Sequence, residues 1–172
     1  MINVRQQTVD AERGKLSKEY KVTASSVIEA PAELVYRTLA DYREGHPSIL
    51  PKAYFVSLEV EKGGFGEGTV INFQTKVLGA TQSFRSEISE PQPGSVLVET
   101  NVGEMAGKTT FTVEPLDGGS RSMVTIATDG KTKGGGAFGV IERLITKMMM
   151  RRIYKAELDQ IGRVCGSLAR NG

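Results

Sequence analysis

Residues 137–170 read AFGVIERLITKMMMRRIYKAELDQIGRVCGSLAR and contain no proline. Apolar residues recur through this segment at steps of three, four or eight: Phe138, Ile141, Ile145, Met149, Ile153, Ile161, Val164 and Leu168. This spacing predicts one long helix, about 50 Å in length at 1.5 Å per residue. It averages about 3.75 residues per turn, so the apolar stripe is expected to creep around the helix. A helix that lies across a twisted sheet needs such a stripe.

Residues 53–129, which precede the helix, alternate apolar and polar side chains and are interrupted by turn sequences. Each turn contains glycine, as in Gly63-Gly64, Gly79 and Asp117-Gly118-Gly119. The predicted strands are 53–62, 68–78, 80–90, 95–102, 108–115 and 121–129. Short links without helices between them predict an antiparallel meander.

Residues 20–29 alternate in the same way and predict a further strand, which Pro31 ends. Pro31 suits the first turn of a helix, and one face of that helix would carry Val35, Tyr36, Leu39 and Tyr42. Residues 42–50 allow at most a short second helix. The order of elements predicts an α+β domain over residues 20–172, with about seven strands, two short helices after the first strand and a long C-terminal helix. Residues 1–19 are interpreted as a flexible extension.

Composition excludes several classes of function. The chain has 22 Lys and Arg, 20 Asp and Glu, one histidine and one cysteine. This charge balance does not indicate a nucleic-acid partner. One cysteine cannot form an internal disulfide, and a single histidine without a Cys cluster argues against a zinc site. No signal-peptide or membrane-spanning run is visible, so we expect a cytoplasmic protein without a metal or cofactor.

Three motifs occur in order along the chain: VTASSVIEAPAELVYRTLADY from residue 22, GGFGEGTVINF from residue 63, and SEISEPQPGSVLVET from residue 86. With the long terminal helix, they resemble the START-like (SRPBCC) superfamily of polyketide cyclases/dehydratases, lipid-transfer domains and coenzyme-Q-binding proteins. The resemblance covers residues 21–170. It implies a helix-grip fold, in which a curved antiparallel sheet wraps the long helix around a cavity. The superfamily shares no universal catalytic motif, so the fold does not by itself imply an activity.

The residues that line such a cavity can be predicted from strand parity and from the apolar stripe of the helix. The predicted inner face is mostly apolar with scattered hydroxyl groups, which is typical of a site for an apolar ligand oriented by a few hydrogen bonds. The alternative is a solid core. The predicted ligand-binding residues are Leu58, Ile71, Phe73, Thr75, Phe84, Ser86, Val98, Thr100, Phe111, Val113, Phe138, Ile141, Ile145, Met148 and Met149. By the same parity, Arg85, Glu87 and Glu99 are expected to point outward.

The candidates for chemistry are few. His46 is the only side chain that titrates near neutrality. A surface or capping role is the preferred interpretation for it, and general acid/base catalysis, with Tyr36 as a second candidate, is the alternative. Cys165 is expected to be a buried, inert thiol. The glycines of residues 63–68 are interpreted as a hairpin, because a strand and not a helix follows them.

Arg143, Lys147, Arg151 and Lys155 recur every four residues along the helix. Their preferred interpretation is a solvated face, and the alternative is weak contact with an anionic membrane or an acidic protein. Three hypotheses follow: binding or transport of a hydrophobic molecule such as a lipid, quinone or polyketide; a polyketide cyclase/dehydratase-like enzyme; and an interaction module that uses the basic face. The first is preferred.

Overall fold

The computed structural model describes residues 19–103, 107–132 and 136–171. Within these residues the chain folds into seven strands, three α-helices and a 3-10 turn. Their order is β1 (Glu19–Ile28), α2 (Ala32–Ala40), α3 (Gly45–Ile49), β2 (Phe55–Lys62), β3 (Val70–Val77), β4 (Ala80–Gln92), β5 (Val96–Val102), β6 (Gly107–Leu116), η1 (Asp117–Gly119), β7 (Arg121–Lys131) and α4 (Gly136–Asn171). The predicted elements are confirmed. The predicted extension lies outside the described residues, except for Glu19, which begins β1.

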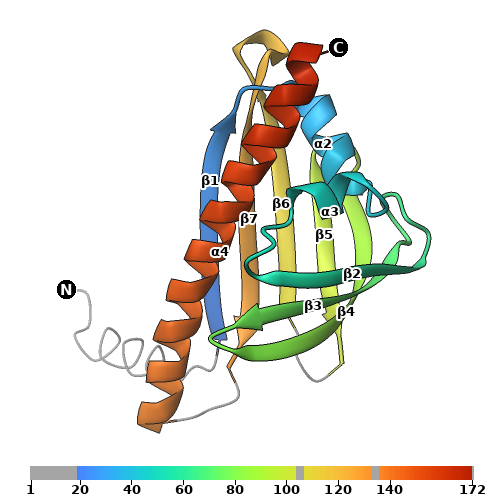
Figure 1. The fold of residues 1–172 in the computed structure, drawn as a ribbon. Coiled ribbons are helices and arrows are strands. Elements are labelled where there is room, and N and C mark those ends of the chain that lie inside the picture. Colours follow the sequence, from blue (N-terminus) through green and yellow to red (C-terminus); the bar gives the residue numbers. More distant parts are fainter. Residues whose placement is uncertain (1–18, 104–106, 133–135, 172) are drawn as a thin grey trace, which may run out of the picture.

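The strands form one antiparallel sheet in the order β1-β7-β6-β5-β4-β3-β2. All neighbours from β2 to β7 are consecutive in the chain, which confirms the meander, and β1 adds to the β7 edge. Figure 1 shows β2–β4 running at a large angle to β1 and β7, so the sheet is strongly curved and α4 crosses its concave side. This is the predicted helix-grip arrangement.

Helix α4 packs mainly on one end of the sheet. Its principal contacts are with β1, α2 and α3. The C-terminal half of α4 buries Tyr154, Leu158, Ile161 and Cys165 in the core. Within the described residues, the inner-face side chains Leu58, Phe73 and Phe84 of β2–β4 remain half-buried.

The glycine-rich loop between β2 and β3 closes against the end of α2. Gly63, Gly64, Gly66 and Gly68 all have positive φ, which glycine adopts readily. Gly66 N–H donates to the Ala40 carbonyl over 2.9 Å, and Tyr42 N–H donates to the Gly64 carbonyl over 2.9 Å. The loop is therefore a hairpin that holds the α2–α3 corner, as the sequence indicated, and not a phosphate loop.

One strand faces the opposite way from the prediction. The Glu99 side chain contacts Tyr42 and His46 inside the molecule, and Leu97 is fully buried in the core. Because side chains alternate along a strand, Val98 and Thr100 lie on the other, convex face. The prediction that Glu99 points outward is wrong, because it took Val98 and Thr100 as the inner residues of this strand, whereas Leu97 and Glu99 face the interior.

The first half of α4 also differs from the prediction. Four predicted cavity residues are exposed, namely Phe138, Ile141, Ile145 and Met148. The apolar stripe creeps as predicted, by about 40° per step of four residues, but it begins on the outer face and first becomes buried at Met149. Among the described residues, no helix is both long and apolar enough to cross a membrane.

Candidate functional site

The α2–α3 corner is built by Asp41, which follows the last residue of α2. Its carboxylate accepts hydrogen bonds from the backbone N–H groups of Arg43, Glu44 and Gly45 at 3.0–3.3 Å. An Asp that accepts local backbone N–H groups is a common way to begin a helical turn. The corner turns α3 back over the concave face of the sheet and places Tyr42 and His46 in the interior.

Tyr42, His46 and Glu99 form a buried cluster at this corner. The Tyr42 hydroxyl donates to Glu99 Oε1 over 2.7 Å, and the His46 ring stacks on the Tyr42 ring with centroids 4.5 Å apart. His46 Nδ1 lies 2.7 Å from the Leu39 carbonyl. Since a carbonyl only accepts, Nδ1 carries the hydrogen, and Nε2 faces Glu99 Oε1 at 3.6 Å.

His46 is only 2% exposed, so a surface position is wrong for it, whereas its bond to the Leu39 carbonyl near the end of α2 agrees with the predicted capping role. Burial raises the pKa of Tyr42 well above its usual value, and the charge of Glu99 adds to this effect. Tyr42 is therefore a neutral hydrogen-bond donor, and Glu99 is its acceptor.

Tyr36, the second predicted candidate, is buried beside this cluster but has a different partner. Its hydroxyl donates to Glu90 Oε1 over 2.5 Å, while Glu90 Oε2 accepts from the backbone N–H of Glu67 over 2.7 Å. Burial and the bond to Glu90 raise the pKa of Tyr36. Glu90 thus ties α2 to the glycine-rich loop, which gives Tyr36 a structural role in the described geometry.

Glu157 reaches the same interior from α4. It is 3% exposed, and no described residue forms a hydrogen bond or ion pair with its carboxyl group. Burial raises its pKa to about 8, and the charge of Glu99 contributes to the shift. At neutral pH Glu157 is therefore mostly a protonated carboxylic acid, able to donate one hydrogen bond and to accept others.

Hydroxyl and amide groups continue the polar surface across the sheet. Glu99, Thr109 and Thr128 are cross-strand partners on β5, β6 and β7. Thr109 and Thr128 share a hydrogen bond of 2.7 Å, and Thr128 also bonds the Tyr154 hydroxyl of α4. In the neighbouring row, the buried Ser86 donates to Asn101 over 2.7 Å. A polar band therefore crosses the middle of the concave face.

Beside this band, β2–β4 present an apolar wall. The Phe73 and Phe84 rings stack with centroids 5.1 Å apart, and Phe55 lies 6.2 Å from Phe73. Leu58 and Thr75 are inner-face neighbours of these rings by register. All five side chains are only half-buried, whereas Ile71 nearer the corner is buried. The wall is thus an apolar surface that the protein's own helix leaves partly uncovered.

The structure brings together some of the predicted ligand-binding residues and separates others. Grouped on the concave face are Leu58, Ile71, Phe73, Thr75, Phe84, Ser86, Phe111 and Val113. Val98 and Thr100 lie on the convex face. On α4, Met149 is buried and Phe138, Ile141, Ile145 and Met148 are exposed.

Sequence reasoning missed Tyr42, Glu99, Tyr154 and Glu157 as parts of the site. One signal was available for Glu157. It lies seven residues after Met150, three after Tyr154 and four before Ile161, which is the spacing of one helix face. Within the described residues, no three Asp, Glu, His or Cys side chains are grouped as a metal ion would require. Cys165 is buried, and burial raises the pKa of its thiol, in keeping with an inert role.

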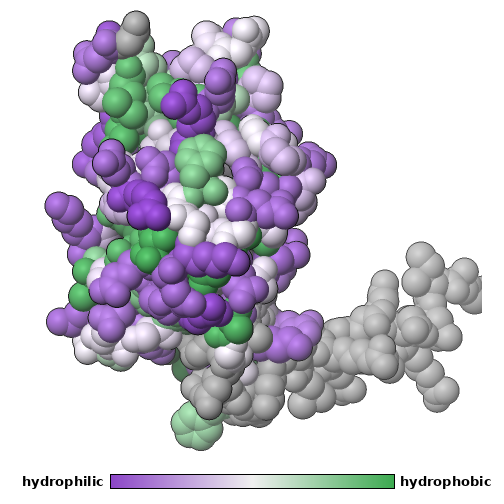
Figure 2. All heavy atoms as spheres, turned by 90° about the vertical axis from the view of Figure 1, so that its right-hand side faces the viewer, coloured by the Kyte–Doolittle hydropathy of each residue, from purple (hydrophilic) through white to green (hydrophobic). Residues whose placement is uncertain are grey.

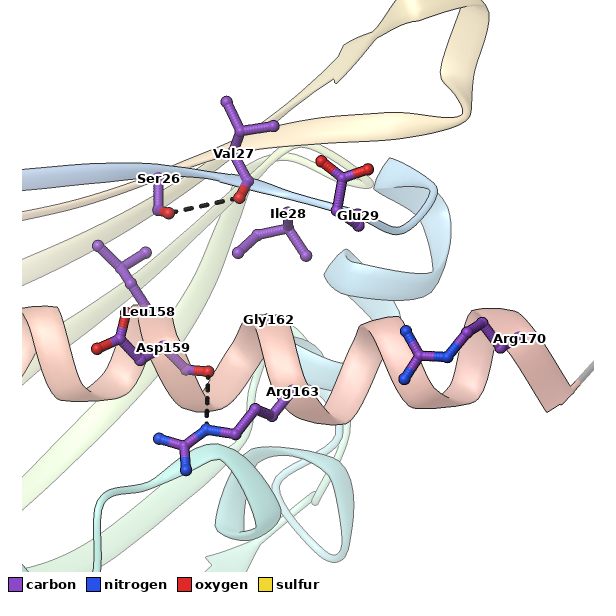
Figure 3. A pocket seen from close by; sticks show the side chains of 9 residues that line it. All are labelled: Ser26, Val27, Ile28, Glu29, Leu158, Asp159, Gly162, Arg163 and Arg170. Carbon is purple, nitrogen blue, oxygen red and sulfur yellow. Dashed lines mark hydrogen bonds between the residues drawn. The ribbon is translucent and has the colours of Figure 1, made fainter.

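Two hollows of about 440 and 430 Å³ lie on outer faces. The first lies between the end of β1 and the last turns of α4. Figure 3 shows it lined by apolar Ile28 and Leu158 and by the charged groups of Glu29, Asp159, Arg163 and Arg170. The second lies over β2–β4 and is lined by polar residues such as Glu59 and Arg85 and also by Phe73 and Phe84. Charged groups of both signs line each hollow.

Solved structures share the fold. The chain is similar to the KanY protein (22% identity, TM-score 0.73), with 86% of this chain and 97% of that one covered. It is also similar to the Zhui aromatase/cyclase from Streptomyces sp. R1128 (20% identity, TM-score 0.71), with 86% of this chain and 93% of that one covered. A START superfamily protein from Mycobacterium smegmatis matches at 13% identity and a TM-score of 0.67, over 86% and 98%. No curated protein sequence matches significantly.

At the level of sequence, residues 19–166 match the model of a family described as "Polyketide cyclase / dehydrase and lipid transport". This match spans the sheet, both short helices and nearly all of α4, and so includes every residue of the buried polar cluster. Its extent confirms the resemblance inferred from the three motifs. The chain therefore belongs to the polyketide cyclase / dehydrase and lipid transport family.

Proposed function

We propose that the protein binds a neutral, hydrophobic small molecule that carries a hydroxyl or carbonyl group, on the concave face of the sheet. One observation carries this proposal. A half-exposed apolar wall, formed by Leu58, Phe73 and Phe84, adjoins a polar band that ends at Glu157, whose carboxyl group forms no hydrogen bond with any described residue.

The apolar wall supplies affinity. Apolar surface removed from water contributes about 25 cal/mol per Å², and stacked aromatic rings offer a flat surface to a ligand with fused or planar rings. Binding sites for small molecules are usually apolar with a few placed polar groups. The wall and the polar band together have this composition.

The polar groups select the kind of ligand. Because the Glu157 carboxyl group forms no hydrogen bond with any described residue, a ligand that pairs with it gains a hydrogen bond. The protonated carboxyl of Glu157 donates to a carbonyl or hydroxyl oxygen, and the Glu99 carboxylate accepts from a hydroxyl. Anionic groups are disfavoured here, because Glu99 already holds negative charge in a poorly solvated place.

Binding is tested with the fluorescent probe N-phenyl-1-naphthylamine, which is neutral, and with its sulfonated analogue 1-anilinonaphthalene-8-sulfonate. The chain contains no tryptophan, so a substituted tryptophan reports its distance to the probe by energy transfer. We expect the neutral probe to bind more tightly than the sulfonate. Tighter binding of the sulfonate would contradict the proposed ligand class.

Substitutions at two neighbouring residues of β2 test on which face of the sheet the probe binds. Leu58→Trp adds bulk to the concave face, whereas the matched control Glu59→Trp adds it to the convex face, where the second hollow lies. We expect Leu58→Trp to weaken neutral-probe binding at least tenfold and Glu59→Trp to leave it within twofold. The reverse result would place the ligand in the outer hollow and overturn the proposal.

A second candidate function, cyclisation and dehydration of a polyketide, is favoured by one observation: His46 Nε2 and the Glu99 carboxylate meet beside Glu157. Such a reaction needs a base to remove a proton next to a carbonyl and an acid to protonate the hydroxyl that leaves as water. If the protein converts a β-polyketone, His46→Gln should abolish product formation and retain probe binding. Unchanged product formation would exclude His46 as the base.

A further inference from the structure

We infer that the first half of α4 docks the protein on an anionic lipid surface. Five large apolar side chains of this segment are exposed: Phe138 (85%), Ile141 (54%), Leu144 (63%), Ile145 (42%) and Met148 (47%). At about 100° per residue they occupy an arc of about 120° on the helix. The arc faces away from the side that carries Tyr154, Glu157 and Ile161, so the structure leaves it without a protein partner among the described residues. We call it the outer apolar ridge.

Cations continue the same face of α4 directly after the ridge. Arg151, Arg152 and Lys155 are exposed and point within the same arc or beside it at 100° per residue. Lys155 pairs with Asp159 at 3.0 Å, whereas Arg151 and Arg152 form no ion pair with any described residue. Their charge is therefore available to an external anion.

Among the described residues outside α4, the exposed large apolar side chains are Val27, Val56, Phe65, Leu78 and Val102, which lie on different elements. The side shown in Figure 2 is largely hydrophilic, with apolar residues scattered among polar ones. Exposed apolar residues that occur singly are ordinary, whereas a contiguous group marks a contact surface. The ridge is a group of five along three turns of one helix.

Charge decides between a lipid surface and a second copy of the chain. A symmetric dimer through this helix would bring the same patch from both subunits together, and the five ridge side chains contain no carboxylate to pair with Arg151 and Arg152. A lipid surface instead receives apolar side chains at the boundary of headgroups and acyl chains, while cations bind the phosphates. The ridge and the adjoining arginines fit that arrangement. This inference does not depend on the proposed ligand site, since the ridge lies on the opposite side of α4.

Flotation of the full chain with vesicles tests the inference. We expect binding to phosphatidylcholine vesicles that contain 30% phosphatidylglycerol at low salt, little binding to pure phosphatidylcholine, and release at 500 mM NaCl. Each basic residue contributes about fivefold to partitioning, so Arg151→Glu with Arg152→Glu should reduce it at least about tenfold. The matched control, Lys52→Glu with Lys62→Glu, makes the same change of charge at exposed positions elsewhere and should change partitioning less than threefold.

A second pair of variants tests the apolar contribution. Ile141→Ser with Leu144→Ser should reduce partitioning at least about tenfold, because two side chains no longer enter the lipid. Val56→Ser, at an equally exposed valine of β2, should have no effect. Thermal melting of all variants should match the wild type, since the substituted side chains are exposed.

Three results would overturn the inference: no binding to anionic vesicles, equal binding to neutral vesicles, or an equal loss in the controls. A dimer that light scattering detects in the wild type and not in the Ile141→Ser, Leu144→Ser variant would also overturn it, and would assign the ridge to a second copy.

Discussion

The two halves of α4 have similar apolar content and opposite relations to the rest of the molecule. In the C-terminal half, Tyr154, Leu158 and Ile161 are buried against β1, α2 and α3. In the N-terminal half, Phe138, Leu144 and Ile145 face outward. The helix holds the fold together at one end and presents an apolar surface at the other. Hydrophobic periodicity alone thus identifies a helix and its faces but does not say which face the protein itself covers.

The largest expected effect is the loss of packing in the C-terminal half. Ile161 is fully buried, so Ile161→Ala should lower the free energy of unfolding by about 4 kcal/mol through lost contacts and a cavity. The same substitution in the other half, Ile145→Ala, should change it by less than about 0.5 kcal/mol. Urea unfolding measures both. Equal losses would mean that both halves pack in the same way, and the comparison would fail.

The next effect is the pH dependence due to Glu157. Its pKa is raised to about 8 in the folded protein and is near 4.5 when unfolded. The folded state therefore binds the extra proton, and its stability falls as pH rises from about 4.5 to about 8. The loss is at most about 3 kcal/mol by pH 7. Glu157→Gln does not titrate, so its advantage over the wild type should grow with pH. Urea unfolding at several pH values measures the free energy of unfolding of both proteins. If the difference between them stayed constant with pH, the prediction would be contradicted.

The smallest effect concerns the bond between α4 and β7. Tyr154→Phe removes the hydroxyl that bonds Thr128 and leaves the bond between Thr128 and Thr109 in place. The expected cost is about 1 kcal/mol in the free energy of unfolding. We also expect the β7 amides to exchange hydrogen faster in the variant, because β7 loses a bond to α4. Slower exchange than in the wild type would contradict this expectation.

Much of the fold could be predicted because its signals are local. Alternating strands, glycine turns such as Gly63-Gly64 and the break at Pro31 depend on neighbours in the chain. Which side chains of β5 lie on the concave face could not be predicted from neighbours in the chain. Glu99 points inward because Tyr42 and His46, more than fifty residues earlier, meet it there. A charged residue between Val98 and Thr100 on a strand is normally assigned to the solvent side.

The candidate site was only partly predictable for the same reason. The apolar wall, with Phe73 and Phe84, followed from parity on β3 and β4. The positions of the polar groups did not follow from parity. His46 is buried only because the hydrogen bonds of Asp41 fix the α2–α3 corner and so place α3 over the sheet. Likewise, the raised pKa of Glu157 depends on its burial and on where α4 lies relative to Glu99 of β5. These are tertiary facts that override the local preference of each residue.

The pairing of β1 with β7 has a consequence for the order of events when the chain folds. Glu19 and Lys131 are register partners, so the earliest strand must wait until more than a hundred further residues have been made before it finds its neighbour. Contacts between such distant parts of a chain are slow to form. During synthesis the hairpins from β2 to β6 can close in succession, while β1 stays unpaired until the last strand leaves the ribosome. We therefore expect the completion of the sheet, and not the closing of its hairpins, to set the folding rate.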